Sequence, residues 1–150
     1  MKKKILIFTG SRADYGLMKN VIFEIKKQKK INCEVVAGNA HYSKYFGSTF
    51  REIKNDKIKI DYSIKKNFDK LLHEDVIDYI SKTLPIFKAI IKKSSPNLIL
   101  VLGDRFEVFS FVQAAFFLKI GIAHIHGGEV TSGAFDDNIR HSITKFSNYH

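Results

Sequence analysis

Short apolar runs alternate along the chain with segments whose apolar residues recur every three or four positions. Ile5–Phe8 has the pattern of a buried strand, and Leu17, Val21 and Ile25 then recur at the spacing of an amphipathic helix. Cys33–Ala37 repeats the strand pattern. Strands that alternate with helices in this way predict a parallel sheet covered by helices.

The next part of the chain has a weaker pattern. We expect short helices at Ser43–Phe46 and Thr49–Lys54. Ile58–Ile64 alternates apolar and polar residues, which is typical of an edge strand. A longer helix follows, because apolar residues recur at helical spacing over Val76–Ile91. Pro85 should kink or divide that helix, since proline removes a backbone donor and clashes with the preceding turn.

The last third of the chain repeats the alternation more clearly. Leu98–Leu102 is an uninterrupted apolar run, which is typical of a central parallel strand. We expect a buried helix over Arg105–Leu118, a strand over Ile120–Ile125, and a final helix from about Asp136. The whole pattern predicts one α/β domain over residues 1–150, with a Rossmann-like parallel sheet and helices on both faces. The apolar face of the final helix should comprise Phe135, Ile139, Ile143 and Phe146.

Composition limits the class of protein. The chain has 150 residues, 45% of them hydrophobic and 27% charged, which is an ordinary balance for one globular domain. No apolar run approaches the roughly 20 residues that cross a bilayer. Ile5–Phe8 is also too short to be a secretory signal. We therefore expect a cytoplasmic protein without a membrane partner. Cys33 is the one cysteine, so there is no disulfide framework.

The net charge of +10 raises the hypothesis of nucleic-acid binding, but its distribution argues against it. Lysine supplies 21 of the 25 basic residues, scattered over the expected outer faces of helices. Three of the four arginines, Arg12, Arg105 and Arg140, instead lie in polar motifs that follow strands. Guanidinium groups bind phosphate or carboxylate in a fixed geometry. We therefore expect these arginines to contact a ligand, and we expect no nucleic-acid partner.

Three polar motifs follow predicted strands. They are Thr9–Gly16, Gly103–Glu107, and His124–Glu129 with its continuation through residues 136–141. In an open parallel sheet, ligands bind outside the carboxyl ends of the strands. The topology therefore predicts that the three motifs converge on one crevice.

The first motif admits two interpretations. Gly10, Ser11 and Arg12 at a strand-to-helix turn suit an anionic group near a helix amino terminus. The glycine spacing is not that of a dinucleotide fingerprint. The alternative is a tight turn in which Asp14 caps the helix.

The second and third motifs contain groups that can move protons. Asp104 lies at the mouth of a central strand, although capping the next helix or pairing with Arg105 would also explain it. His126 and Glu129 flank Gly127 and Gly128, whose backbone can approach a ligand closely.

The final helix begins with two carboxylates. Asp136 and Asp137 each precede a basic residue by four positions, Arg140 and His141, so pairing within the helix is a plausible alternative to a catalytic role. We expect His124, inside a strand, to be structural. No spacing of these groups matches a metal-ligand motif, and we expect neither a metal nor an organic cofactor.

Together the three motifs resemble the hydrolysing UDP-N-acetylglucosamine 2-epimerase family, which begins sialic-acid-type sugar synthesis. The likeness is carried by Gly10–Tyr15, Gly103–Glu107 and His124–Lys145, and it extends over essentially the whole chain. It implies a two-domain fold like that of B-type glycosyltransferases (GT-B), with the nucleotide-sugar between two Rossmann-like halves. This chain would be the amino-terminal half, without the carboxyl-terminal nucleotide-binding domain.

The resemblance also implies a reaction and residue roles. UDP-N-acetylglucosamine, or a related nucleotide-linked amino sugar such as those leading to legionaminic acid, would give a free N-acetylmannosamine-type sugar and UDP, by elimination to a glycal and hydration. At the position of His126 several members have a catalytic glutamate, so either His126 or Glu129 takes over that proton transfer. Asp104, Asp136 and Asp137 match acidic residues implicated in catalysis. The substrate-binding set implied or suggested by the motifs comprises Arg12, Asp14, Arg105, Gly127, Gly128, Arg140 and His141.

The length of the chain bears on these expectations. It stops directly after a well-patterned helix, so we expect a longer protein, and we expect residues 1–150 alone to be inactive. The family implies a homo-oligomer, a dimer or tetramer. Two other functions remain open, a sugar-nucleotide glycosyltransferase half-domain and a noncatalytic nucleotide-sugar-binding module.

Overall fold

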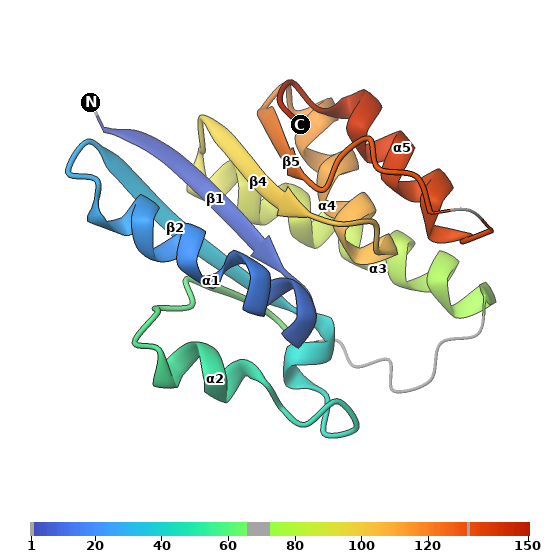
Figure 1. The fold of residues 1–150 in the computed structure, drawn as a ribbon, viewed down its shortest axis with the longest axis horizontal. Helices are drawn as coiled ribbons and strands as arrows, with labels where there is room; N and C mark the ends of the chain where they lie inside the picture. Colours follow the sequence, from blue (N-terminus) through green and yellow to red (C-terminus); the bar gives the residue numbers. More distant parts are fainter. Residues whose placement is uncertain (1, 66–72, 132) are drawn as a thin grey trace.

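The computed structural model describes residues 2–65, 73–131 and 133–150 and contains a five-stranded parallel sheet (Figure 1). Across the sheet the strands follow the order β3-β2-β1-β4-β5. The predicted strands are confirmed, except that the edge strand is shorter than expected. Their bounds are Lys3–Thr9 for β1, Ile31–Gly38 for β2, Tyr62–Ile64 for β3, Leu98–Leu102 for β4 and Gly121–Ile125 for β5.

The strand order reverses direction at β1. Ile5 is in register with Cys33 of β2 on one side and with Leu98 of β4 on the other. Leu98 is in turn in register with Gly121 of β5. The chain therefore builds the sheet outward in both directions from β1, and the carboxyl ends of β1, β4 and β5 lie side by side. In such sheets the crevice at the reversal point binds the ligand.

Helices cover both faces of the sheet, as predicted (Figure 1). Helices α1 (Arg12–Lys27) and α2 (Phe50–Asn55) lie on one face. Helices α3 (His73–Ser94), α4 (Phe106–Phe117) and α5 (Asp136–Phe146) lie on the other. The sheet is thus buried on both sides, which explains the uninterrupted apolar sequence of its central strands.

Alternate residues of β1 belong to two separate cores. Phe8 packs toward α3 and α4, with its ring centroid 5.4 Å from that of Phe87 and 5.2 Å from that of Phe111. Ile7 points to the opposite face and joins the cluster formed by α1, α2 and β2. This two-sided burial fixes the position of β1, and hence of the polar residues that follow it.

The buried face of α1 differs from the predicted stripe. Tyr15, Met18 and Ile22 are buried against the sheet, whereas Leu17 is 62% exposed. The helix carries two overlapping apolar stripes, and the stripe through Tyr15 also reaches α2, because its hydroxyl donates to Asp56 over 2.7 Å. Periodicity within one helix does not distinguish such stripes.

Three other local predictions are wrong. A 3-10 helix, η1 (Asn39–Tyr42), ends where a helix over Ser43–Phe46 was expected, and the chain turns there, with the Ser48 N–H donating to the Ser43 carbonyl over 2.9 Å. The next predicted helix is confirmed as α2. Of the two effects expected of Pro85, a kink or a division, the division is wrong, because helix α3 continues through this residue. Phe135 is 71% exposed and does not join the buried face of α5.

Among the residues that the structure describes, no helix has the length and apolar character needed to cross a membrane.

Candidate active site

The three polar motifs lie at one edge of the sheet, after the carboxyl ends of β1, β4 and β5. The guanidinium group of Arg105, in the second motif, interacts electrostatically with carboxylates from all three motifs. Burial lowers the pKa of its guanidinium, but Glu107, together with Asp14 after β1 and Asp136 in α5, raises that pKa above its usual value. The expected convergence therefore holds for the segments, although each side chain has its own partners.

Asp14 is committed to the turn after β1. Its carboxylate accepts hydrogen bonds from the backbone N–H groups of Gly10 and Ser11, each at 2.9 Å, and from the Thr9 hydroxyl at 2.8 Å. Ser11 is the N-cap of α1 and forms a capping box with Asp14. The capping interpretation is confirmed. The two amides that suited an anionic ligand already bind this buried carboxylate.

A buried histidine, which the motif analysis did not use, continues this network. His41 lies with Nε2 2.9 Å from the Thr9 hydroxyl oxygen and Nδ1 2.8 Å from that of Thr49. The Thr9 hydroxyl donates to Asp14, so Nε2 of His41 must donate to Thr9 and Nδ1 must accept from Thr49. Burial lowers the pKa of His41, consistent with this neutral ring.

Arg12 occupies the first position of α1 and is exposed at the same edge. Its side chain is 74% exposed, and its Nε lies 3.0 Å from Oε1 of Glu52 in α2. An exposed ion pair of this kind adds little stability and can exchange partners easily.

Arg105 and Asp104, adjacent in sequence, bind different partners. Arg105 donates to the fully buried Glu107 through Nε over 3.2 Å and Nη2 over 2.8 Å. Asp104 instead accepts from Nη2 of Arg140, 36 residues away. The two simpler explanations of Asp104 are therefore wrong: the N-cap of α4 is Arg105, without a side-chain cap, and the guanidinium of Arg105 is occupied by Glu107.

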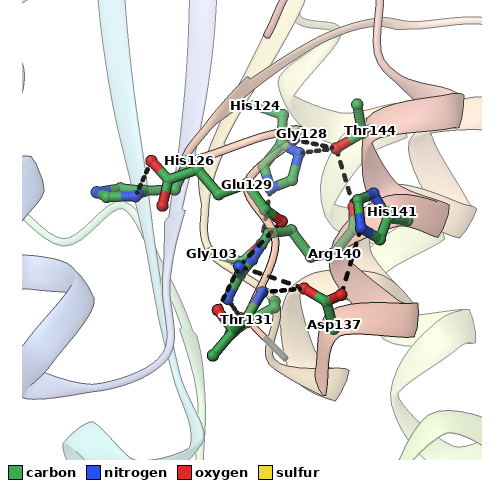
Figure 2. Close-up of polar contacts among 11 residues, drawn as sticks. Gly103, His124, His126, Gly128, Glu129, Thr131, Asp137, Arg140, His141 and Thr144 are labelled. Atoms are coloured by element: carbon green, nitrogen blue, oxygen red, sulfur yellow. Dashed lines mark hydrogen bonds and ion pairs between the residues drawn. The ribbon is translucent and has the colours of Figure 1, made fainter. Parts of the chain in front are cut away.

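Arg140 joins three segments of the site, and Figure 2 shows its contacts with the loop after β5 and with Asp137. Besides Asp104, its Nη1 lies 3.2 Å from the Glu129 carbonyl oxygen, 3.0 Å from the Thr131 hydroxyl and 3.5 Å from Oδ1 of Asp137. Its side chain is only 12% exposed. This guanidinium therefore ties the end of β4, the loop after β5 and the first turn of α5 together.

The carboxylates of α5 divide into one bound and one exposed group. Asp137 accepts from the Thr131 N–H over 3.0 Å and lies 3.4 Å from Nε2 of His141, which confirms that predicted helix pair. The other predicted pair is wrong, because Arg140 contacts Asp137 and not Asp136. Asp136 is exposed at the first position of the helix.

His126 and Glu129 form an exposed pair in the loop that follows β5. Nδ1 of His126 lies 2.9 Å from Oε1 of Glu129, and both side chains are about half exposed, at 46% and 59%. In Figure 2 they extend away from Arg140 and Asp137. The loop can turn here because His126 and Gly128 have left-handed backbone angles, with φ of 64° and 78°.

His124 is structural, as expected, and is bonded at both ring nitrogens. Nε2 lies 2.7 Å from the Gly103 carbonyl oxygen and Nδ1 3.2 Å from the Thr144 hydroxyl oxygen. Burial is the main cause that lowers its pKa. The sequence did not predict the roles of Thr144 and Thr131, because an isolated threonine in a loop or helix has no characteristic spacing.

The assembled groups suit acid–base chemistry on an anionic ligand. The imidazole–carboxylate pair of His126 and Glu129 lies at this edge of the sheet. Asp104 and Asp136 lie at the same edge, and Arg12 offers an exposed cation there. No group of three His, Cys, Asp or Glu side chains within the described part of the chain is placed to hold a metal ion.

Comparison with known proteins supplies the family. The family model for UDP-N-acetylglucosamine 2-epimerase matches residues 23–150. The UDP-N,N'-diacetylbacillosamine 2-epimerase (hydrolyzing) of Legionella pneumophila is 35% identical over 150 residues, covering 100% of this chain and 40% of that protein. The GDP/UDP-N,N'-diacetylbacillosamine 2-epimerase (hydrolyzing) of Campylobacter jejuni is 34% identical, covering 99% of this chain and 38% of that protein.

Solved structures support the fold. The UDP-GlcNAc 2-epimerase of Neisseria meningitidis, bound to UDP-GlcNAc, superposes with a TM-score of 0.84 at 23% identity, covering 98% of this chain and 39% of that one. Another UDP-N-acetylglucosamine 2-epimerase gives a TM-score of 0.85 at 20% identity, covering 98% and 40%. The fold is thus the amino-terminal, Rossmann-like half of a GT-B-like architecture. The chain spans about 40% of the length of these relatives, and it belongs to the UDP-N-acetylglucosamine 2-epimerase family.

Proposed function

We propose that this chain is the amino-terminal domain of a hydrolysing nucleotide-sugar 2-epimerase, whose remaining domain binds the nucleotide. The substrate is a UDP-linked 2-acetamido sugar, and the products are the free 2-epimer and UDP. The observation that carries the proposal is that the His126–Glu129 pair and the Asp104–Arg140 pair lie at one edge of the sheet, where such sheets bind ligands. The two hydrolyzing relatives at 34–35% identity support the same reaction.

The first half of the proposed reaction is an elimination. The bond between C1 and the diphosphate oxygen breaks, and its electron pair leaves with UDP. Positive charge then develops at C1, where the carboxylates of Asp104 and Asp136 stabilise it. A base removes the proton from C2, and the electrons of that C–H bond form the C1–C2 double bond of a glycal.

The second half is a hydration. Water adds its hydroxyl group to C1, and C2 receives a proton from the face opposite to the one that lost it. The free sugar is therefore the 2-epimer. Because the two proton transfers at C2 take place on opposite faces, the group that removed the first proton cannot return it, so this step needs a second proton donor and an acceptor for the proton of the attacking water.

We assign the proton transfer to Nε2 of His126. Its Nδ1 faces the Glu129 carboxylate at 2.9 Å, so Nδ1 carries the proton and Nε2 keeps a free lone pair. Glu129 then orients the ring and stabilises its charged form, as carboxylates do in other catalytic pairs. Arg12 is the first candidate for the diphosphate, because only an exposed pair with Glu52 holds it.

Product analysis of the full-length protein tests the proposal. With UDP-N,N'-diacetylbacillosamine or UDP-N-acetylglucosamine, we expect equal amounts of UDP and free 2-epimer, measured by ion-exchange chromatography and NMR. An epimer still linked to UDP, a sugar transferred to an acceptor, or binding without turnover would each contradict it.

Asp104→Asn links that activity to this site. We expect kcat to fall by about 100-fold or more, because a charge that stabilises the transition state is lost. Asp78→Asn is the matched control. Asp78 is an exposed carboxylate on α3 paired with Lys82, and its variant should keep the wild-type rate.

A further inference from the structure

His124 and Thr144 connect the loops that carry the proposed catalytic groups. One end of the His124 ring contacts the Gly103 carbonyl oxygen at 2.7 Å, and Gly103 precedes Asp104. The other end contacts Thr144, whose hydroxyl oxygen also accepts from the Gly128 N–H over 3.1 Å. Gly128 in turn precedes Glu129. His124 and Thr144 therefore connect the backbone just before Asp104 to the backbone just before Glu129 (Figure 2).

Two of the hydrogen bonds in this connection have a fixed direction, the one from the Gly128 N–H and the one to the Gly103 carbonyl. A carbonyl oxygen accepts only, so Nε2 of His124 must carry the hydrogen that meets Gly103. In a neutral ring Nδ1 is then a bare acceptor, and it shares the single hydrogen of the Thr144 hydroxyl with the Arg140 carbonyl oxygen, at 3.2 Å and 3.0 Å. Burial lowers the pKa of His124 and favours that neutral form. The Gly128 N–H therefore donates to Thr144 and the His124 N–H donates to Gly103, while the Thr144 hydroxyl lies between His124 and the Arg140 carbonyl.

The backbone of the loop lies directly against this pair. A Cβ added at Gly127 would lie 3.0 Å from Nδ1 of His124, 3.1 Å from Oγ1 of Thr144 and 2.8 Å from Cβ of His150. The loop therefore has no room to move closer, while the Gly128 N–H bond keeps it from moving away. Thr144 Oγ1 also lies 3.0 Å from the Arg140 carbonyl, which places the pair on the same helix as the guanidinium that binds Asp104.

We propose that Thr144, through its hydroxyl group, is a positioning residue that sets the His126–Glu129 pair relative to Asp104, with His124 as its partner. The inference rests on the proposed function, since it concerns the geometry of that reaction. Groups that must act on C1 and C2 of one sugar tolerate little displacement, and an error of about 1 Å can cost on the order of 100-fold in rate.

The test compares two substitutions of Thr144 in the full-length protein. Thr144→Val keeps the shape and removes the hydroxyl, and we expect kcat to fall about 10- to 100-fold with KM for the UDP-sugar changed less than about twofold. Thr144→Ser keeps the hydroxyl and should restore most of the turnover. Ser142→Ala is the matched control, because it removes a hydroxyl-to-carbonyl bond of the same helix that does not reach the loop.

A second variant approaches the same contact from the loop. Gly127→Ala inserts a methyl group against His124 and Thr144, so it should lower kcat in the same way. Unchanged kcat in Thr144→Val, or a loss that Thr144→Ser shares equally, would overturn the inference, because the hydroxyl would then not matter. Absence of turnover in the wild-type protein would instead contradict the proposed function itself.

Discussion

Asp14 and Arg12 stand two positions apart in the first motif and have opposite surroundings. Asp14 is buried and accepts three hydrogen bonds, whereas Arg12 is exposed and holds one surface pair. We expect Asp14→Ala to lower the free energy of unfolding by about 1–3 kcal/mol, because buried donors lose their acceptor and α1 loses its capping box. Urea unfolding of the full-length protein measures this change.

Arg12→Ala provides the comparison. Its exposed ion pair should contribute no more than about 1 kcal/mol to stability. If Asp14→Ala unfolds at the same urea concentration as the wild type, the three hydrogen bonds of the carboxylate do not stabilise the fold.

His41 gives the fold a dependence on pH. Its ring is fully buried, and burial lowers its pKa below the unfolded value of about 6.5. The unfolded chain therefore takes up a proton before the folded chain does. Stability should be complete above about pH 6.5 and should fall as the pH decreases below it, by at most about 1.4 kcal/mol per pH unit from this group.

The difference between wild type and His41→Gln isolates that contribution. We expect the free energies of unfolding of the two proteins, plotted against pH, to converge as the pH decreases from 7.5 to 5, since only the wild type loses the contribution of the histidine. His124, whose pKa is also lowered, affects both proteins equally. Curves that stay parallel would show that His41 titrates alike in both states.

At the scale of helices and strands, the sequence predicted those elements whose apolar pattern has one interpretation. Leu98–Leu102 is the observed β4 to the residue, because an apolar run of this length between polar turns fits a buried strand. The segment over Ser43–Phe46 failed, since hydrogen bonds of the turn decide its path. The predicted stripe of α1 is correct only in part, because the helix has two apolar stripes: Val21 and Ile25 are partly buried against the core, whereas Leu17 is exposed.

Helix α3 tolerates a residue that should weaken it. Pro85 is exposed in the middle of α3, where it lacks the N–H of an interior helical residue and crowds the preceding turn. Pro85→Ala should therefore raise the free energy of unfolding by about 1–3 kcal/mol, measured by urea unfolding. Pro96→Ala, outside the helices, is the control and should give no such gain. A loss of stability in Pro85→Ala would mean that the proline ring makes a contact worth more than the missing hydrogen bond.

At the scale of the whole molecule, topology predicted that the three motifs meet at one edge of the sheet but not how their charges pair. Parallel strands bring their carboxyl ends to one edge whatever the side chains are, so the meeting of the three motifs follows from the strand order. The ion pairs of the charged side chains do not follow from the strand order. Asp104 pairs with Arg140, whereas its neighbour Arg105 pairs with Glu107. The path of α4 and α5 determines these partners, and residue spacing does not indicate them.

In the proposed reaction, His126 at this edge of the sheet removes the proton at C2 of a nucleotide-linked sugar. The most direct measurement is the reaction of the full-length protein with a UDP-linked 2-acetamido sugar in deuterium oxide, followed by NMR of the released sugar. We predict a free 2-epimer that carries deuterium at C2, because His126 removes the original proton and the group that protonates the opposite face of C2 delivers a deuteron acquired from the solvent. A free 2-epimer that keeps hydrogen at C2 would contradict the account.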